Sequence, residues 1–239
     1  MRRVLSEFSG LARLPIPNCV RERLKRIFVA RKYGVRLGSG VTVSRTTVLE
    51  GRSTVGSNSD ISGSYIGLGT YIADNSRVTN ARIGRFCSIG RGVSTGAGIH
   101  PTRSFVSTHP SFFSPASQAG FSFTERALFQ EHVYAVKDER GHNAYQVAIG
   151  NDVWIGNNVH ILDGVTVADG AVVGLGAIVT ADLQPYSINV GSPAKPIAYR
   201  FSAVQIEFLL SFRWWEKSFA WIEDNASLFA DIDLFMSNC

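Results

Sequence analysis

Branched aliphatic residues recur every six positions in the second half of the chain. The series contains Ile149, Ile155, Ile161, Val167, Val173 and Val179. A second apolar series lies four residues beyond each member of the first: Val153, Val159, Val165, Ala171, Ala177 and Leu183. A period of six fits neither an α-helix nor plain strand alternation. It is typical of a short strand followed by a sharp corner, and three such units close a triangular coil of about eighteen residues.

A weaker copy of this pattern precedes it. Its members are Val55, Ile61, Ile66, Ile72, Val78, Ile83 and Ile89, and two of the steps are five residues long. Further upstream the pattern fades into Val35, Val41 and Val48. Stacked coils of this kind bury their aliphatic residues inside a prism of parallel strands. We therefore predict an all-β solenoid, a parallel β-helix, over residues 35–198.

The repeat stops after Ile89 and resumes near Ile149, which predicts a long excursion loop at about residues 97–147. Four of the five histidines lie in it: His100, His109, His132 and His142. So do six phenylalanines, which favour a packed lobe over a disordered loop. The stretch YAVKDERGHNAYQV is typical of a hairpin. We expect His132 and His142 at its surface, and His160 on the outside of a coil.

The two ends of the chain have a different character. Residues 1–34 form a basic segment that we expect to be partly helical, with nine basic and two acidic residues and a net charge of +7. The whole chain carries +5, so the remainder sums to −2. A basic segment is typical of a solvated helix face, and it also suits peripheral contact with an anionic membrane surface.

Residues 199–239 are predicted to be helical. Ser202 and Gln205 have the spacing of a capping box, and the aromatic residues that follow suggest packing against the coils.

The cysteine spacing fits neither a disulfide framework nor a zinc site, and Cys87 occupies a small core position. No run of about eighteen apolar residues predicts a transmembrane helix. We therefore expect a cytoplasmic protein, held at the inner face of the membrane if the basic segment binds lipid. The basic residues gather at one end and no known recognition motif is present, so nucleic-acid binding is not expected.

The segment GNDVWIGNNVHILDGVTVADGAVVGLGAIVTADLQPYSINVGSPAKPI resembles the hexapeptide-repeat acetyltransferases. The tail AYRFSAVQIEFLLSFRWWEK resembles their xenobiotic branch, which includes chloramphenicol, streptogramin and many polysaccharide O-acetyltransferases. The resemblance covers Val55 to Trp221. It implies a left-handed parallel β-helix with C-terminal helices, acetyl-CoA as co-substrate, no metal, and a homotrimer with active sites between subunits.

Acetyl transfer from a thioester to a hydroxyl needs a base, and a histidine suits neutral pH. His100 opens the excursion in GIHPT, where the resemblance places the catalytic histidine, and Pro101 favours an extended backbone before it. The family's Ser/Thr-x-Pro-Phe-like stretch reads STHPSFF here, which is close but not identical. His109 is a rival base, and we expect it instead to contact the acceptor together with Phe112 and Phe113.

The resemblance also suggests residues for acetyl-CoA. Trp154 takes an outward position in its repeat. The resemblance implies that its indole lies beside the thioester, and the structural alternative is that it covers the seam between subunits. Successive coils carry small residues at Gly156, Gly174 and Ala177. Coil geometry requires them, and they also allow close approach of the pantetheine arm. The phosphates of CoA are expected to meet two basic residues, Lys195 and Arg200.

The sequence thus predicts an acetyl-CoA-dependent O-acetyltransferase that acts on a hydroxyl of a sugar or surface polysaccharide precursor by direct transfer. Two other enzyme functions fit the same scaffold: antibiotic O-acetylation of the chloramphenicol or streptogramin type, and N-acetylation of an amino sugar. A non-catalytic β-helix that serves as a binding platform is the alternative outside enzymes.

Overall fold

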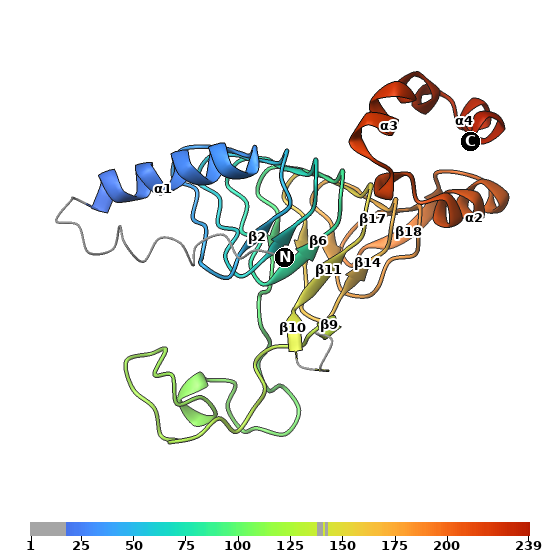
Figure 1. Ribbon diagram of the computed structural model, residues 1–239. Helices are drawn as coiled ribbons and strands as arrows, with labels where there is room; N and C mark the ends of the chain where they lie inside the picture. Colours follow the sequence, from blue (N-terminus) through green and yellow to red (C-terminus); the bar gives the residue numbers. More distant parts are fainter. Residues whose placement is uncertain (1–17, 138–140, 142) are drawn as a thin grey trace.

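The computed structural model describes residues 18–137, 141 and 143–239, and within them the chain winds into a three-sided parallel β-helix (Figure 1). Its largest face is an eight-stranded sheet, counted over the described residues. The sheet contains, in spatial order, β1 (Arg36–Leu37), β3 (Thr54–Val55), β5 (Tyr71–Ile72), β7 (Ser88–Ile89), β12 (Trp154–Ile155), β15 (Val172–Val173), β17 (Ser187–Val190) and β18 (Lys195–Tyr199). All neighbours pair in parallel except β17 and β18, which form an antiparallel end.

Two smaller sheets form the other faces. The five-stranded sheet contains β2 (Val48–Leu49), β4 (Tyr65–Ile66), β6 (Ala81–Ile83), β11 (Val147–Ile149) and β14 (Thr166–Val167). The three-stranded sheet contains β8 (Ser94–Thr95), β13 (His160–Ile161) and β16 (Ile178–Val179), as far as the described residues show. Isolated bridges through Thr42, Asp60 and Arg77 continue this third face toward the first coils.

The six-residue pattern correctly predicts the core. Each member of the series from Ile149 to Val179 is buried, and so is each member from Val153 to Leu183. Parallel pairing of Ile155 with Ile89 and Val173 stacks equivalent positions of successive coils. The predicted fold class, a left-handed parallel β-helix with an excursion and C-terminal helices, is confirmed.

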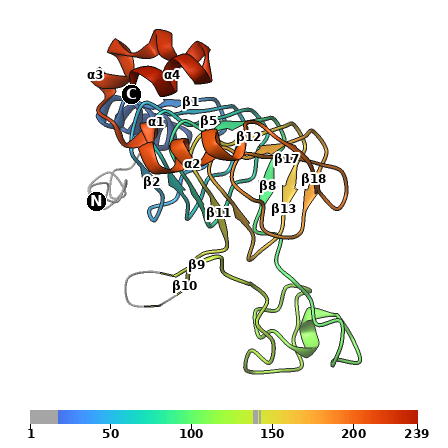
Figure 2. The same ribbon diagram turned by 90° about the vertical axis from the view of Figure 1, so that its right-hand side faces the viewer.

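The excursion occupies residues 96–146, between the end of β8 and the start of β11. Figure 2 shows it as a separate lobe that hangs from one side of the solenoid. A 3₁₀ helix (Pro110–Phe112) lies in the lobe, and the predicted hairpin is present as β9 (Val136–Lys137) paired antiparallel with β10 (Asn143–Tyr145). His142, expected at the hairpin surface, lies outside the described residues.

Helices close the two ends. Helix α1 (Asn18–Tyr33) contacts β1, and Val29 joins the solenoid core. After β18 come α2 (Ala203–Phe212), a 3₁₀ helix (Trp214–Glu216), α3 (Phe219–Asp224), a second 3₁₀ helix (Ala226–Ala230) and α4 (Ile232–Asn238). The predicted capping box of Ser202 and Gln205 is present.

The C-terminal region has its own apolar core. Trp215 is almost fully buried there, in a cluster with Tyr186, Leu209, Trp214 and Phe235. The helical region predicted over residues 199–239 is divided into short segments after α2. These aromatic residues pack among themselves and against the last coils, as the sequence suggested.

Candidate functional site

The order of the strands places the excursion at one corner of the prism. The chain runs from β12 in the eight-stranded sheet to β13 in the three-stranded sheet and then to β14 in the five-stranded sheet. The excursion leaves after β8 and returns at β11, so it replaces the corner between the three-stranded and five-stranded sheets. In a triangular coil, this corner lies opposite the eight-stranded sheet.

His100 lies in the first part of the excursion and its side chain is exposed. Its Nδ1 atom is 2.7 Å from the carbonyl oxygen of Thr108, and its ring meets the edge of Phe113 with centroids 5.7 Å apart. Pro101, which follows, is buried. The imidazole is therefore held on one side by a hydrogen bond and on another by an aromatic ring.

The Thr108 contact determines the tautomer of neutral His100. A carbonyl oxygen only accepts hydrogen bonds, so Nδ1 of His100 must carry the proton and donate it. The remaining lone pair is then on Nε2. This arrangement leaves one nitrogen, Nε2, able to accept a proton.

A hydrogen-bonded clasp joins the two ends of the excursion to the coil. The Asp163 carboxylate, fully enclosed at the corner, accepts hydrogen bonds from Nδ1 of His132 at 3.0 Å and from the amide of Gly98 at 3.3 Å. The Ile99 amide donates to the carbonyl of Glu131 at 2.7 Å. Residue 99 directly precedes His100, so the clasp fixes the backbone position from which the His100 side chain extends.

His132 therefore differs from the expectation of a simple surface residue. Its side chain is half exposed, yet its ring bonds to a buried carboxylate. His160 remains exposed, as expected, with Nδ1 2.5 Å from Oγ of Ser94 on the coil below.

The outer face of the lobe is aromatic. His109 caps the 3₁₀ helix by accepting a hydrogen bond from the Ser111 amide, and its ring stacks on Phe121. Phe112 is exposed and contacts Phe123, whose side chain is also exposed. These rings offer flat apolar surface to an acceptor. His109 accepts at Nδ1, so its local role is structural.

Phe113 lies inside the lobe instead of on this face. Its side chain is completely buried and packs against Phe105, Phe129 and His100. The structure therefore corrects the expectation that Phe113 presents its ring to an acceptor. Its position beneath the imidazole supports His100, because a packed aromatic ring restricts where the histidine ring can lie.

Trp154 is on the eight-stranded sheet with 57% of its surface exposed. The outward position predicted from the repeat is correct, and its strand neighbours are Ser88 and Val172. This sheet lies opposite the corner that carries His100. Within one chain, the indole and the imidazole therefore face different directions.

The small residues predicted to line an acetyl-CoA site fall into two groups. Gly156 and Gly174 follow strands of the eight-stranded sheet, and a Cβ at Gly156 would lie 2.6 Å from the Leu175 amide nitrogen. Coil geometry therefore demands glycine there. Ala177 belongs to the second inward-facing series and is fully buried. Its methyl group lines the prism core, so a ligand at this point would meet backbone only.

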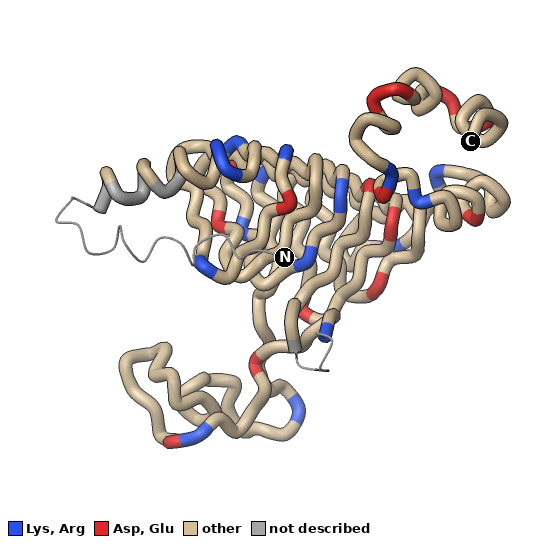
Figure 3. Tube along the Cα trace, in the orientation of Figure 1, with Lys and Arg blue, Asp and Glu red and all other residues tan. Residues whose placement is uncertain are grey.

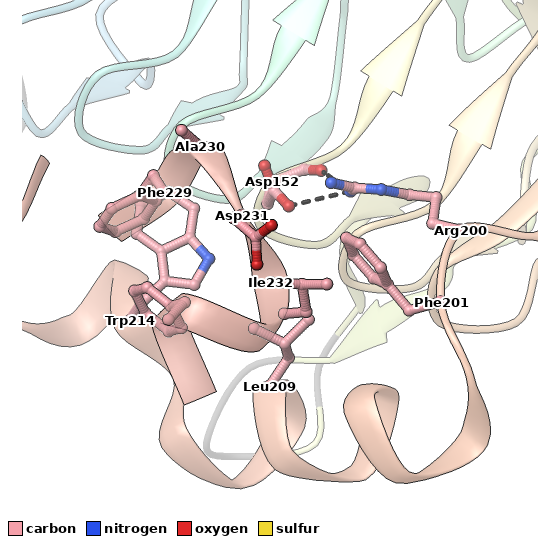
Figure 4. Close-up of a pocket in the computed structure, with 10 residues that line it drawn as sticks. Asp152, Arg200, Phe201, Leu209, Trp214, Phe229, Ala230, Asp231 and Ile232 are labelled. Carbon is pink, nitrogen blue, oxygen red and sulfur yellow. Dashed lines mark hydrogen bonds and ion pairs between the residues drawn. The ribbon is translucent and has the colours of Figure 1, made fainter. Parts of the chain in front are cut away.

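Lys195 and Arg200 have different environments, although we grouped them in the sequence. Lys195 begins β18 and is exposed. Nη1 of Arg200 is 2.9 Å from Oδ2 of Asp152 and donates to the carbonyl of Gly170 at 2.9 Å. Figure 4 shows this pair at the wall of a pocket of about 560 Å³ against the C-terminal helices. Burial raises the pKa of Asp152, and Arg200 opposes that rise.

A second ionic cluster braces the five-stranded sheet. Glu50 accepts two hydrogen bonds from the Arg85 guanidinium, at 2.7 and 3.1 Å, and others from the Tyr65 hydroxyl and the Leu68 amide. Burial alone would raise the pKa of Glu50, but these hydrogen bonds outweigh it and lower the pKa from 4.5 to about 2. Arg85 also donates to the carbonyl of Trp215, so the cluster links the coils to the C-terminal region.

No three of the His, Cys, Asp and Glu side chains among the described residues are grouped so that they could hold a metal ion. None of the helices in the described part of the chain is both long enough and apolar enough to cross a membrane.

Sequence reasoning missed Asp163, His132 and the Thr108 carbonyl as parts of the site. An aspartate at a coil corner is common in this chain, and Asp152, Asp169 and Asp182 occupy similar places. The residues of the clasp are far apart in the sequence, and the His100 contact is made by a backbone atom. No sequence pattern marks either feature.

Comparison with known proteins gives several relatives of clear similarity, whereas no family model matches the chain. The chain is 36% identical to a chloramphenicol acetyltransferase of Agrobacterium fabrum over 74% of this chain and 80% of that protein. It is 34% identical to a chloramphenicol acetyltransferase of Morganella morganii, and that match spans 62% of the relative's length. Among solved structures, the acetyltransferase domain of PglB from Neisseria gonorrhoeae in complex with acetyl coenzyme A is similar with a TM-score of 0.48 and 18% identity, over 75% of this chain and 66% of that one.

Proposed function

This chain belongs to the chloramphenicol acetyltransferase family of hexapeptide-repeat proteins, and on that premise we propose that it transfers an acetyl group from acetyl-CoA to a hydroxyl group of a small polar acceptor. His100 is the general base. The observation that carries this proposal is the Nδ1 contact of His100 with Thr108, because it leaves Nε2 free to accept a proton on an exposed imidazole.

The reaction proceeds in one complex that contains both substrates. Nε2 of His100 takes the proton of the acceptor hydroxyl as the oxygen attacks the thioester carbonyl. The new C–O bond forms, the C–S bond breaks, and the departing thiolate receives the proton from the imidazolium. Cys87 is not a nucleophile, since its side chain is buried in the prism and burial raises the pKa of its thiol to about 12.

The active site of this proposal lies between two copies of the chain in a homotrimer. Trp154 is exposed on the eight-stranded sheet, opposite the corner that holds His100. A neighbouring copy supplies the missing partner when its Trp154 faces the lobe of the first. The indole then lies beside the thioester, close to Gly156 and Gly174, and Lys195 meets the CoA phosphates.

The leading acceptor is a hydroxyl of a sugar or of a surface polysaccharide precursor. The exposed rings of Phe112, Phe121 and Phe123 support this class, because aromatic faces stack on the C–H faces of sugars. Chloramphenicol is the second candidate, favoured by the names of the relatives. Both acceptors carry the hydroxyl that the His100 mechanism requires.

Substitution of His100 tests the mechanism. In an assay that follows release of CoA thiol, His100→Ala should lower kcat by about 10²- to 10⁴-fold while the KM for acetyl-CoA changes little. His160→Ala is the matched control, since this exposed histidine lies on a coil and should retain most activity. Full activity of the His100 variant would reject the assignment.

A mixing experiment tests the shared site. Chains with His100→Ala and chains with Trp154→Ala, each of low activity alone, are co-expressed so that they assemble together. Mixed trimers contain interfaces with an intact His100 from one copy and an intact Trp154 from the next, so activity should reappear. If both residues acted within one chain, the mixture would remain as inactive as its parts.

Acceptor choice is tested by comparing hydroxyl sugars, amino sugars and chloramphenicol in the same assay. The highest kcat/KM identifies the class, and turnover of an amino sugar alone would replace O-acetylation by N-acetylation. Failure to bind acetyl-CoA by calorimetry would instead favour a non-catalytic scaffold.

A further inference from the structure

Helix α1 closes the first coil with only one of its faces. Val29 is buried in the solenoid core and Tyr33 packs against that core one turn later. At 100° per residue, these two positions lie on the same side of the helix. The opposite side of the helix faces away from this core.

That opposite side carries an apolar stripe. Residues 20, 24 and 27 follow the helical spacing of one face, and residue 28 lies beside them. The stripe consists of Val20, Leu24, Ile27 and Phe28, each 39–42% exposed. Most other aliphatic side chains of the protein point inward. Together with Arg31 and Lys32, three residues of the stripe line a shallow groove. Large apolar side chains aligned on one exposed helix face indicate a binding surface.

The same helix is strongly basic. Between Asn18 and Tyr33 the sequence has a net charge of +5. Its one acidic residue is Glu22, and its six basic residues are Arg21, Arg23, Lys25, Arg26, Arg31 and Lys32. An apolar stripe on a basic helix fits an anionic lipid surface, where apolar side chains enter the boundary between headgroups and acyl chains. A second copy of the helix fits poorly, because two charges of +5 repel each other.

The far end of the molecule carries the opposite charge. Figure 3 shows acidic residues gathered on α3 and α4, at the end of the solenoid away from α1. Residues 218–239 contain Glu223, Asp224, Asp231 and Asp233 and no lysine or arginine. An anionic surface would therefore attract the α1 end of the molecule and repel the other.

We propose that α1 is a peripheral membrane-binding helix that lies in the headgroup region of an anionic bilayer, with Val20, Leu24 and Ile27 toward the acyl chains. The first coils of the solenoid then lie nearest the membrane. This inference does not rest on the acetyl-transfer reaction. It would bring the enzyme to acceptors held at a lipid surface.

Vesicle flotation with the full chain tests the proposal. Vesicles of phosphatidylcholine mixed with phosphatidylglycerol should carry the protein, vesicles of phosphatidylcholine alone should carry at least about tenfold less, and added salt should weaken the binding. The double substitution Leu24→Glu with Ile27→Glu should reduce flotation at least about tenfold. Val204→Glu is the control, because it changes an exposed apolar residue on α2 and should float like the unchanged protein.

Circular dichroism and cooperative thermal unfolding establish that the double variant is folded. The proposal is overturned if the unchanged protein stays with the lipid-free fraction. It is also overturned if the folded double variant floats normally, or if it loses its oligomeric state in light scattering, which would make the stripe a contact between copies.

Discussion

The Nδ1 atom of His132 lies 3.0 Å from a carboxylate oxygen of Asp163, and the aspartate side chain is wholly enclosed. These residues come from the return of the excursion and from a coil corner. The same carboxylate accepts from the Gly98 amide in the outgoing chain. One buried group thus ties both ends of a lobe of about fifty residues to the solenoid, two residues before His100.

Substitution of His132 should affect catalysis through position. Among the described residues, His132→Ala leaves the enclosed Asp163 carboxylate with the Gly98 amide as its donor, which should cost about 1–3 kcal/mol in the free energy of unfolding. The His100 loop becomes less ordered, so kcat should fall while the pH dependence of kcat keeps its midpoint. Urea denaturation and steady-state pH profiles measure the two effects.

His132→Asn provides the companion variant. Its amide can still donate to Asp163, so it should restore part of the lost kcat and stability. An unchanged kcat in His132→Ala, with clear destabilisation, would show that the clasp holds the lobe without setting the position of His100.

The solenoid was predictable because its physics is local and repetitive. A residue every six positions must point into the prism, and Ile149, Ile155 and Ile161 are all buried as expected. The same rule placed Trp154 outside. It also places the Ala177 methyl group inside, so that a pantetheine arm at this coil could contact only the backbone.

The lobe was not predictable at the same level. Its aromatic content correctly indicated packing, but no period determines which ring lies inside, and Phe113 rather than Phe112 is the buried one. The pairing of Arg200 with Asp152 could not be predicted either, because 48 residues separate them in the chain and only the fold brings them together.

The Glu50 cluster predicts a pH-dependent contribution to stability. The pKa of Glu50 falls from 4.5 to about 2 in the folded chain, so this carboxylate stabilises the fold above its ordinary pKa. That stabilisation is lost as the pH falls from about 4.5 toward about 2. Because the cluster is partly exposed, we expect Glu50→Gln to cost about 1–2 kcal/mol at neutral pH.

The check is urea denaturation of both proteins at neutral pH and at about pH 4. The difference in unfolding free energy between wild type and Glu50→Gln should be smaller at the lower pH. Glu207→Gln, a change at an exposed position on α2, should show no such dependence. A difference that grows on acidification would contradict the lowered pKa.

Alanine substitution at two glycines distinguishes the stability lost through backbone strain from the stability lost through steric overlap. Gly170 and Gly176 have nearly equal positive φ angles, +68° and +69°. A Cβ at Gly170 would overlap the ring of buried Tyr186, whereas a Cβ at Gly176 has no neighbour within 4 Å. Both alanine variants should lose about 1–2 kcal/mol from left-handed strain, and Gly170→Ala should lose about 1–3 kcal/mol more from overpacking. Thermal unfolding of the two variants compares them directly, and equal losses would mean that the Tyr186 ring moves aside freely.

The two basic residues assigned to CoA phosphates should separate in function. Lys195 is exposed at the start of β18, so Lys195→Ala should leave the fold intact and raise the KM for acetyl-CoA about tenfold, as expected for one lost charge-assisted hydrogen bond. Arg200 bonds instead to Asp152 and Gly170. Removing it leaves a largely buried carboxylate without its cation, so Arg200→Ala should cost about 2–3 kcal/mol of stability with little change in KM. Calorimetric binding of acetyl-CoA and thermal unfolding of both variants distinguish the two roles. A tenfold weaker affinity for acetyl-CoA in Arg200→Ala, at unchanged stability, would contradict this assignment and place Arg200 at the phosphates as well.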